Sequence, residues 1–256
     1  MSHHRFTKLF CVATAAAMFG FAADAADTVP QGDTYDSIAQ LPDWSGTWIP
    51  FQGRPSVWQM DLKDFTPEWR KKVEIIDAIH ARGGDQEGRD KHCIFQGLPS
   101  DMAGPEVVQD FVYSPGRVTI TDVQGFVRRI YTDGRKHKPG PLSFFGDSIG
   151  HWENVNGTMT LVSDTINLDP GNEMAYGLPV GKNAHVVERF YLDPKDKNVL
   201  LLDMTVYAPE GWPQPVTNTT KYRRRSDTEM VEWDCALNNR DLDVGGNQIM
   251  NLTPPK

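Results

Sequence analysis

From Val107 onward, hydrophobic and polar positions alternate with a period of two, which is typical of β-strands with one buried face. Short connections rich in Gly, Pro, Asn and Asp separate these segments, and Asn156-Gly157 is the strongest hairpin signal among them. The pattern predicts about nine strands, at 107–113, 117–123, 126–132, 148–155, 158–167, 185–192, 199–207, 216–224 and 229–237.

Sequential strands with short connections form an antiparallel meander, and a meander must protect its edge strands. Closing into a barrel and stacking two sheets are the two solutions. We therefore expect a mainly β fold, with a single antiparallel, calycin-like β-barrel domain over residues 43–256. A β-sandwich is the alternative.

One helix is expected before the strands, at about 67–82. Thr66 is a candidate N-cap, Pro67 suits the first helical turn, and Gly83-Gly84 ends the apolar stripe. The polar, aperiodic residues 26–42 are expected to form a flexible arm.

The first 25 residues have the three parts of a cleavable secretory signal peptide. Arg5 and Lys8 give a positive start, residues 9–22 form a short apolar stretch, and Ala23-Asp24-Ala25 is a small-x-small cleavage site. The apolar stretch is shorter than the roughly 20 residues that span a bilayer. The sequence therefore predicts a periplasmic or secreted protein without a membrane span.

Charge and cysteine content narrow the chemistry further. The formal net charge of −8 argues against nucleic acid as a partner, because phosphate binding depends on Lys and Arg. Cys11 would leave with the signal peptide, so Cys93 and Cys235 would remain. An even pair in an exported protein predicts one disulfide, with two buried thiols or a metal pair as alternatives.

The Asn156-Gly157 hairpin fixes a register that gathers ionisable side chains. A two-residue loop pairs His151 with Val162 and places Glu153 and Asp164 on the same face as His151. A histidine beside carboxylates suits a general base, because the carboxylate orients the ring and raises its basicity. We therefore expect His151 to be the catalytic base, oriented by Asp164 or Glu153, on a face that looks into the barrel.

The opposite assignment of faces is also consistent with the pattern. His, Glu, Thr and Asp are typical of an ordinary solvent face. In that case Trp152, Met159 and Leu161, on the other face, would form the core.

Other strands add candidates for substrate binding, namely Tyr131, Arg129, His185 and Glu188. Glu188 has apolar neighbours on its face, so we expect a buried carboxylate that pairs with Arg128, Arg129 or Arg189, either as a structural ion pair or as a catalytic acid. His137, at a strand end, could border the site.

No organic cofactor is implied, since phosphate-binding glycine loops and dinucleotide fingerprints are absent from the sequence. His137, His151 and His185 with one carboxylate would form a divalent-metal set. Their long spacing gives that set no local support, so we expect no metal.

Two resemblances can be read from motifs. Gly46-Thr-Trp48 resembles the Gly-x-Trp opening of lipocalins. The segments 129–135, 146–153, 164–165 and 185–190 (RIYTDGR, GDSIGHWE, DT and HVVERF) resemble an uncharacterised family of secreted proteins from Gram-negative bacteria, over most of residues 43–240. The hairpin departs from that family's Glu-Gly-Asp, since it reads Glu153-Asn-Val-Asn-Gly157 here. The resemblance implies a periplasmic single domain and no particular reaction.

Three functional hypotheses follow. The first is a periplasmic enzyme, a lyase, isomerase or hydrolase, that uses histidine–carboxylate acid–base chemistry on a small, partly apolar molecule. The second is a non-catalytic, lipocalin-like protein that binds a hydrophobic ligand. The third is a structural or interaction protein of the cell envelope.

Overall fold

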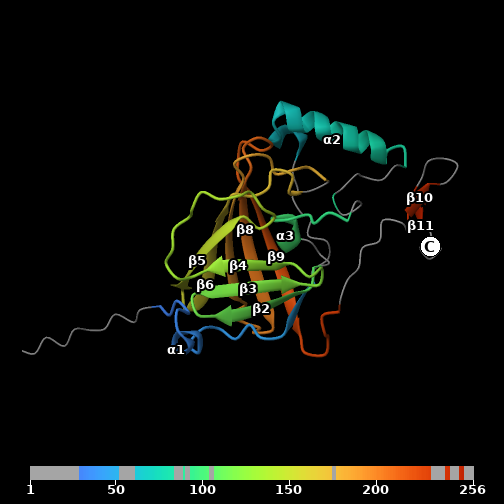
Figure 1. Ribbon diagram of the computed structural model, residues 1–256. Helices are drawn as coiled ribbons and strands as arrows, with labels where there is room; N and C mark the ends of the chain where they lie inside the picture. Colours follow the sequence, from blue (N-terminus) through green and yellow to red (C-terminus); the bar gives the residue numbers. More distant parts are fainter. Residues whose placement is uncertain are drawn as a thin grey trace, which may run out of the picture.

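Within the residues that the structure describes, nine strands close into one barrel in chain order (Figure 1). The computed structural model describes residues 29–51, 61–83, 89, 93–103, 107–174, 177–231, 240–242 and 248–250. The strands are β1 (Thr47–Pro50), β2 (Gln109–Ser114), β3 (Arg117–Asp122), β4 (Val127–Tyr131), β5 (Asp147–Val155), β6 (Thr158–Ile166), β7 (His185–Leu192), β8 (Val199–Tyr207) and β9 (Val216–Arg225). The prediction of a mainly β barrel is confirmed. Outside the barrel, β10 (Arg240–Leu242) pairs with β11 (Gln248–Met250).

The register expected from the Asn156-Gly157 hairpin is confirmed residue by residue. Val155 pairs with Thr158, and His151 pairs with Val162. Both turn residues adopt positive φ angles, 51° for Asn156 and 83° for Gly157. This is the backbone that a two-residue primed turn requires and that Asn-Gly supplies at low steric cost.

Closure of the barrel differs from the expected antiparallel meander in two ways. The short strand β1, which the sequence pattern did not mark as a strand, pairs with both β2 and β9. β4 and β5 run parallel and are joined by two residue pairs, Ile130 with Ser148 and Tyr131 with Ile149. Of the strand expected at 229–237, residues 229–231 are not in a strand and the remainder lies outside the described residues.

The expected helix is present as α2 (Pro67–His80) and lies across one end of the barrel (Figure 1). Thr66 takes the N-cap position, but its hydroxyl donates to the Glu210 carbonyl at 2.7 Å and does not cap the helix. Trp69 is buried and its indole donates to the Pro179 carbonyl at 3.2 Å. Three shorter helices were not expected: α1 (Tyr35–Ile38), the 3-10 turn η1 (Leu62–Asp64) and α3 (Ser100–Ala103).

The expectation of a flexible arm over 26–42 is wrong for its described part, residues 29–42, which are bound to the barrel. Beyond the two parallel pairs, β5 separates from β4, and the Gln31 amide pairs with the exposed strand edge. Gln31 accepts from the Trp152 amide and donates to the Trp152 carbonyl, both at 2.8 Å. Further along, the Tyr113 hydroxyl donates to the Pro42 carbonyl at 2.8 Å.

Replacing Gln31 with Ala should lower the free energy of unfolding by about 1–3 kcal/mol, because both polar groups of the Trp152 peptide lose their partner. Urea denaturation of the variant and of Gln40→Ala would measure this. Gln40 is exposed and bonds within the same N-terminal segment, to the Asp36 carbonyl, so its loss should cost little. Equal stability of the two variants would contradict the assigned role of Gln31.

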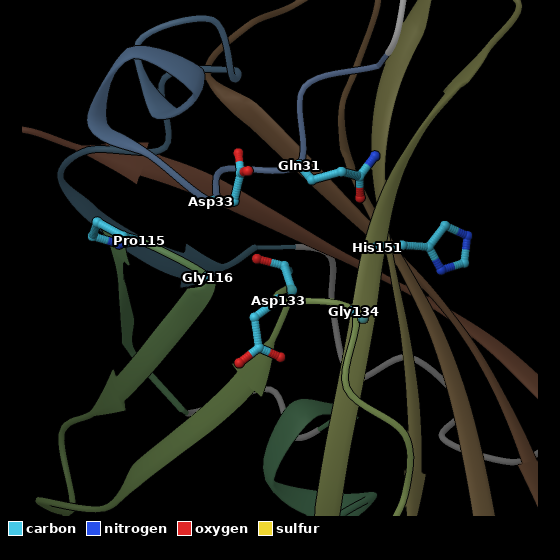
Figure 2. Close-up of a pocket in the computed structure, with 9 residues that line it drawn as sticks. Gln31, Asp33, Pro115, Gly116, Asp133, Gly134 and His151 are labelled. Carbon is cyan, nitrogen blue, oxygen red and sulfur yellow. The ribbon is translucent and has the colours of Figure 1, made fainter.

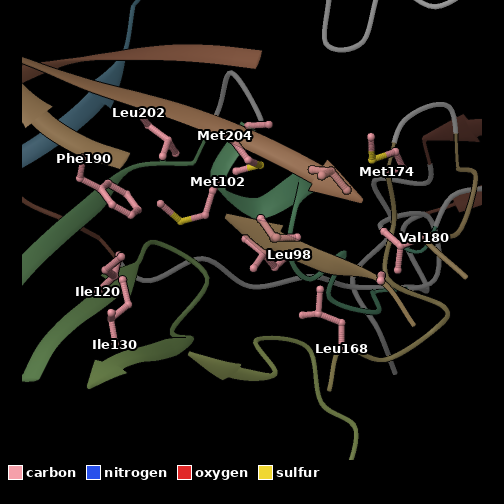
Figure 3. Packing of buried hydrophobic residues seen from close by; sticks show 14 of the residues in the cluster. Leu98, Met102, Ile120, Ile130, Leu168, Met174, Val180, Phe190, Leu202 and Met204 are labelled. Carbon is pink, nitrogen blue, oxygen red and sulfur yellow. The ribbon is translucent and has the colours of Figure 1, made fainter. Parts of the chain in front are cut away.

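Large side chains fill the interior near Trp44. The Trp44 ring contacts Phe111, Trp152 and Phe190 at centroid distances of 5.4, 5.1 and 6.2 Å. Met102 of α3 lies in the same buried cluster as Leu202 and Met204 of β8 (Figure 3). Among the described residues, no helix has the length and apolar character needed to cross a membrane.

Candidate functional site

Four neighbouring strands, β5 to β8, place ionisable side chains together on the outer face of the barrel. Alternation along each strand directs Trp152, Phe190 and their neighbours inward, so Asp147, Asp164 and His185 project outward. On the next strand Tyr207 pairs directly with His185. The arrangement follows from register alone, and it puts two carboxylates beside a histidine.

His137 completes this group from the connection between β4 and β5. Its Nδ1 lies 3.0 Å from Asp147 Oδ2, and its Nε2 lies 2.9 Å from Asp164 Oδ1. Burial by itself would lower the pKa of His137, but the hydrogen bonds to Asp147 and Asp164 outweigh it and the pKa is raised. We call His137, Asp147, Asp164 and His185 the His–Asp cluster.

His185 binds the same carboxylate oxygen as His137. Its Nε2 lies 3.0 Å from Asp164 Oδ1, and its ring stacks on Tyr207 with centroids 5.1 Å apart and planes 18° apart. Because an ionised carboxylate only accepts hydrogen bonds, Nε2 carries the proton in the neutral ring. Nδ1 is then the nitrogen that can take a proton from another molecule.

The expected enclosed position of His151 is wrong. Its side chain is 60% exposed on the outer wall, and its Nε2 lies 3.7 Å from Glu153 Oε2. Trp152 occupies the interior instead, at 2% exposure. Glu153 forms an ion pair with Arg189, so it does not act as a dedicated partner for His151.

His151 borders a surface pocket of about 410 Å³, beside the place where β4 and β5 pair in parallel. In Figure 2 its ring extends away from Asp33 and Asp133, which lie on the other side of β5. The pocket is lined by Gln31, Asp33, Pro115, Gly116, Thr132, Asp133, Gly134, Gly150 and His151. It therefore does not bring His151 into the His–Asp cluster.

The four residues expected to bind substrate separate in space. Tyr131 is covered by Arg135, whose guanidinium carbon lies 3.6 Å from the ring centroid. Arg129 is exposed on β4. Of the other two, His185 joins the His–Asp cluster and Glu188 lies inside the barrel.

Glu188 is fully buried and pairs with Arg128, one of the three partners expected for it. The Arg128 Nη1 donates to Glu188 Oε1 at 2.8 Å, and Nη2 binds the other carboxylate oxygen. Nη2 also lies within reach of three inward hydroxyls: Ser148 and Ser163 at 3.4 Å and Thr165 at 3.2 Å. This geometry is that of a structural ion pair.

Two further expectations, about the histidine metal set and the disulfide, can be compared with the described residues. Among the described residues, no group of three or more His, Cys, Asp or Glu side chains has the arrangement needed for a metal ion. His137 and His185 do come together, but His151 does not join them. The pairing of Cys93 with Cys235 stays a prediction, because Cys235 lies outside the described residues.

The sequence pattern placed Asp164 beside His151, whereas the structure places it beside His137 and His185. His137 was expected only at the edge of a site, since a loop has no periodicity from which its position could be read. Its proximity to Asp147 and Asp164 depends on the path of residues 132–146. In comparisons with known proteins, no family model, no curated protein and no solved structure matches the chain.

Proposed function

We propose that this protein is an exported enzyme that uses histidine–carboxylate acid–base chemistry on a small, partly apolar molecule, as a lyase, isomerase or hydrolase. His185 is the general base and Asp164 orients it. The observation that carries the proposal is the Nε2–Asp164 contact of 3.0 Å, which leaves Nδ1 of His185 to take the proton.

The surroundings of His185 suit such chemistry. The side chain is 35% exposed, so a substrate can reach it, and stacking on Tyr207 restricts rotation of the ring. Ile149 and Val187, half-buried on the same outer face, pair with Asp164 across the sheet and supply apolar surface beside it. A general base in this setting contributes about 10²–10⁴ in rate.

The periplasmic location rests on the signal-like residues 1–25 and on the resemblance to secreted bacterial proteins, and it belongs to the same proposal. A lipocalin-like binding role would need room in the lumen. The rings of Trp44, Trp152 and Phe190 pack together there, so the described interior favours the outer-face enzyme over that role.

Hydrogen–deuterium exchange tests the proposal even though the substrate is unidentified. Purified protein in deuterium oxide is incubated with a panel of small carbonyl compounds, and loss of C–H signals is followed by NMR. Esters and lactones in a second panel report hydrolysis. We expect at least one compound to react faster than in buffer, and Asp164→Asn to lower that rate about 10²-fold because the neutral amide no longer fixes the reactive tautomer.

Asp203→Asn is the matched control. Asp203 lies on the same outer face, on β8. It accepts hydrogen bonds from the hydroxyls of Tyr191 and Thr219, whereas Asp164 binds two histidines. The control should keep the wild-type rate. Equal losses in the two variants, or no acceleration by wild-type protein in either panel, would overturn the proposed function.

A further inference from the structure

His137 connects separate parts of the barrel wall through one ring. It sits in the chain between β4 and β5, and its side chain is 21% exposed. The next residue ties the same stretch to the sheet: the Lys138 amide donates to Asp147 Oδ2 at 3.1 Å, and Asn167 Nδ2 donates to the Lys138 carbonyl at 3.0 Å. The ring is therefore held in place by its own loop as well as by the strands.

Both ring nitrogens of His137 face carboxylates, Asp147 on β5 and Asp164 on β6. An ionised carboxylate only accepts hydrogen bonds, so both contacts are made at once only when each ring nitrogen carries a proton and the ring is an imidazolium. The other ionisable neighbours are His185 on β7, beyond Asp164, and Lys136 and Lys138 on the same loop. In the imidazolium form, the ring lies between two carboxyl groups, to each of which it donates one hydrogen bond.

Asp164 needs such a partner to act as an orienter. Its side chain is 43% exposed on the outer wall, where a carboxylate can rotate between staggered conformations. Bonding to His137 directs Oδ1 toward the gap between the two rings, where it also accepts from His185. A fixed Oδ1 selects the Nε2–H tautomer of His185.

We propose that His137 is a positioning residue: its imidazolium clamps Asp164 between β5 and β7, so that His185 holds its proton on Nε2 and presents Nδ1 as the base. This inference rests on the proposed function, since it names the group that organises the same site. His137 itself contacts no reacting atom in this scheme.

The clamp should depend on pH in a defined direction. Since the pKa of His137 is raised, the clamp is complete below the ordinary pKa of histidine and is lost as pH rises through the raised value. Above that value one nitrogen of His137 has no proton to donate, and one of the two carboxylates is released. The Nε2–H preference of His185 should weaken over the same interval.

Imidazole ¹⁵N–¹H correlation NMR on wild-type protein, His137→Gln and His151→Gln tests the clamp. In wild-type protein we expect His137 to be doubly protonated at pH 7 and neutral His185 to be in the Nε2–H form. His137→Gln should shift His185 to a mixture of both tautomers. His151→Gln, which changes an exposed ring outside the cluster, should leave His185 unchanged.

A neutral His137 at pH 7, or an unchanged His185 tautomer in folded His137→Gln, would overturn the inference. Should His137→Gln not fold, the titration of wild-type protein decides alone: His185 signals that move with deprotonation of His137 support the clamp, and signals that do not move overturn it. The NMR readout is independent of turnover. If the NMR signals of His137 and His185 are coupled but neither substrate panel shows a reaction, the proposed function is overturned and the clamp is retained.

Discussion

Replacing Glu188 with Ala is expected to lower the free energy of unfolding by about 3–5 kcal/mol. The substitution leaves the Arg128 guanidinium charged and 1% exposed inside the barrel without its carboxylate. The hydroxyls of Ser148, Ser163 and Thr165 remain as hydrogen-bond partners but carry no compensating charge. An uncompensated buried charge costs more than the loss of the pair's own attraction.

Asp101 of α3 does not replace Glu188 as the counter-ion. Its side chain is buried, and its pKa is raised, chiefly by burial and further by the negative charge of Asp122, against an opposing effect of Arg128. Burial therefore disfavours the charged form of this carboxyl. Glu188, whose two oxygens bind Nη1 and Nη2 of Arg128, is the group that balances the guanidinium.

Urea denaturation of Glu188→Ala and Glu153→Ala provides a matched comparison. Glu153 forms an ion pair with Arg189, the residue after Glu188, on the solvent side of the same sheet. An exposed pair contributes at most about 1 kcal/mol, so Glu153→Ala should be nearly neutral.

The double variant Arg128→Met, Glu188→Leu should regain most of the stability lost in Glu188→Ala, because it removes both buried charges and keeps similar volume. Similar losses in Glu188→Ala and Glu153→Ala would contradict the assigned burial of the pair.

The Arg128–Glu188 ion pair also explains a limit of the sequence pattern. The pattern predicted the register between β5 and β6, but it did not show which face of these strands points into the barrel. The inward positions of β5 and β6 near Arg128 are Ser148, Gly150, Ser163 and Thr165, which read as a polar face. Their hydroxyls serve the guanidinium, and a Cβ at Gly150 would come within 2.8 Å of Ile130 and of the Val162 carbonyl. Apolar Ile149, Val162 and Ile166 lie on the outer side. Hydrophobic alternation is therefore inverted in this part of the barrel.

The way in which the barrel closes could not be predicted either, because the short strand β1 and the parallel pairing of β4 with β5 leave no periodic pattern in the sequence. β1 has four residues and ends in proline, which is too short for an alternation pattern to be recognised. The parallel seam forms because residues 132–146 carry the chain back along β4 before β5 begins. A turn pattern predicts hairpins between neighbours, whereas such a return path is set by contacts such as Asn167 with Lys138.

The sequence could name only some residues of the candidate site, because a periodic pattern exists on strands but not in loops. Asp164 and His185 lie on regular strands, where alternation shows which neighbours share a face within each strand, so the sequence could name each of them as a candidate. Their partnership required the register between β6 and β7, which no tight turn fixes from sequence, because 18 residues separate the strands. His137 required the loop path as well. The pattern could therefore predict which residues of one strand share a face. It could not predict the contacts of Asp164 with His185 and His137.

The second large effect is expected from His185→Gln, which should reduce turnover of any substrate found in the exchange or hydrolysis panels by up to about 10⁴-fold. Glutamine can still donate a hydrogen bond to Asp164, but its amide has no nitrogen basic enough to accept the proton. Binding should change less than turnover, because the loss falls on the proton-transfer step; kcat and KM measured separately would show this. The free energy of unfolding should fall by about 1 kcal/mol or less, as for a partly exposed position.

His151→Gln separates this assignment from the alternative that any histidine of the outer face supports the reaction. Both side chains lie on the outer wall and both contact a carboxylate, but His151 Nε2 is 3.7 Å from Glu153 whereas His185 Nε2 is 3.0 Å from Asp164. The longer distance exceeds that of a hydrogen bond, so the His151 ring is not oriented for proton transfer. His151→Gln should therefore keep the wild-type rate. If it lost activity while His185→Gln kept it, the base would have to be reassigned to His151 and the role of Asp164 withdrawn.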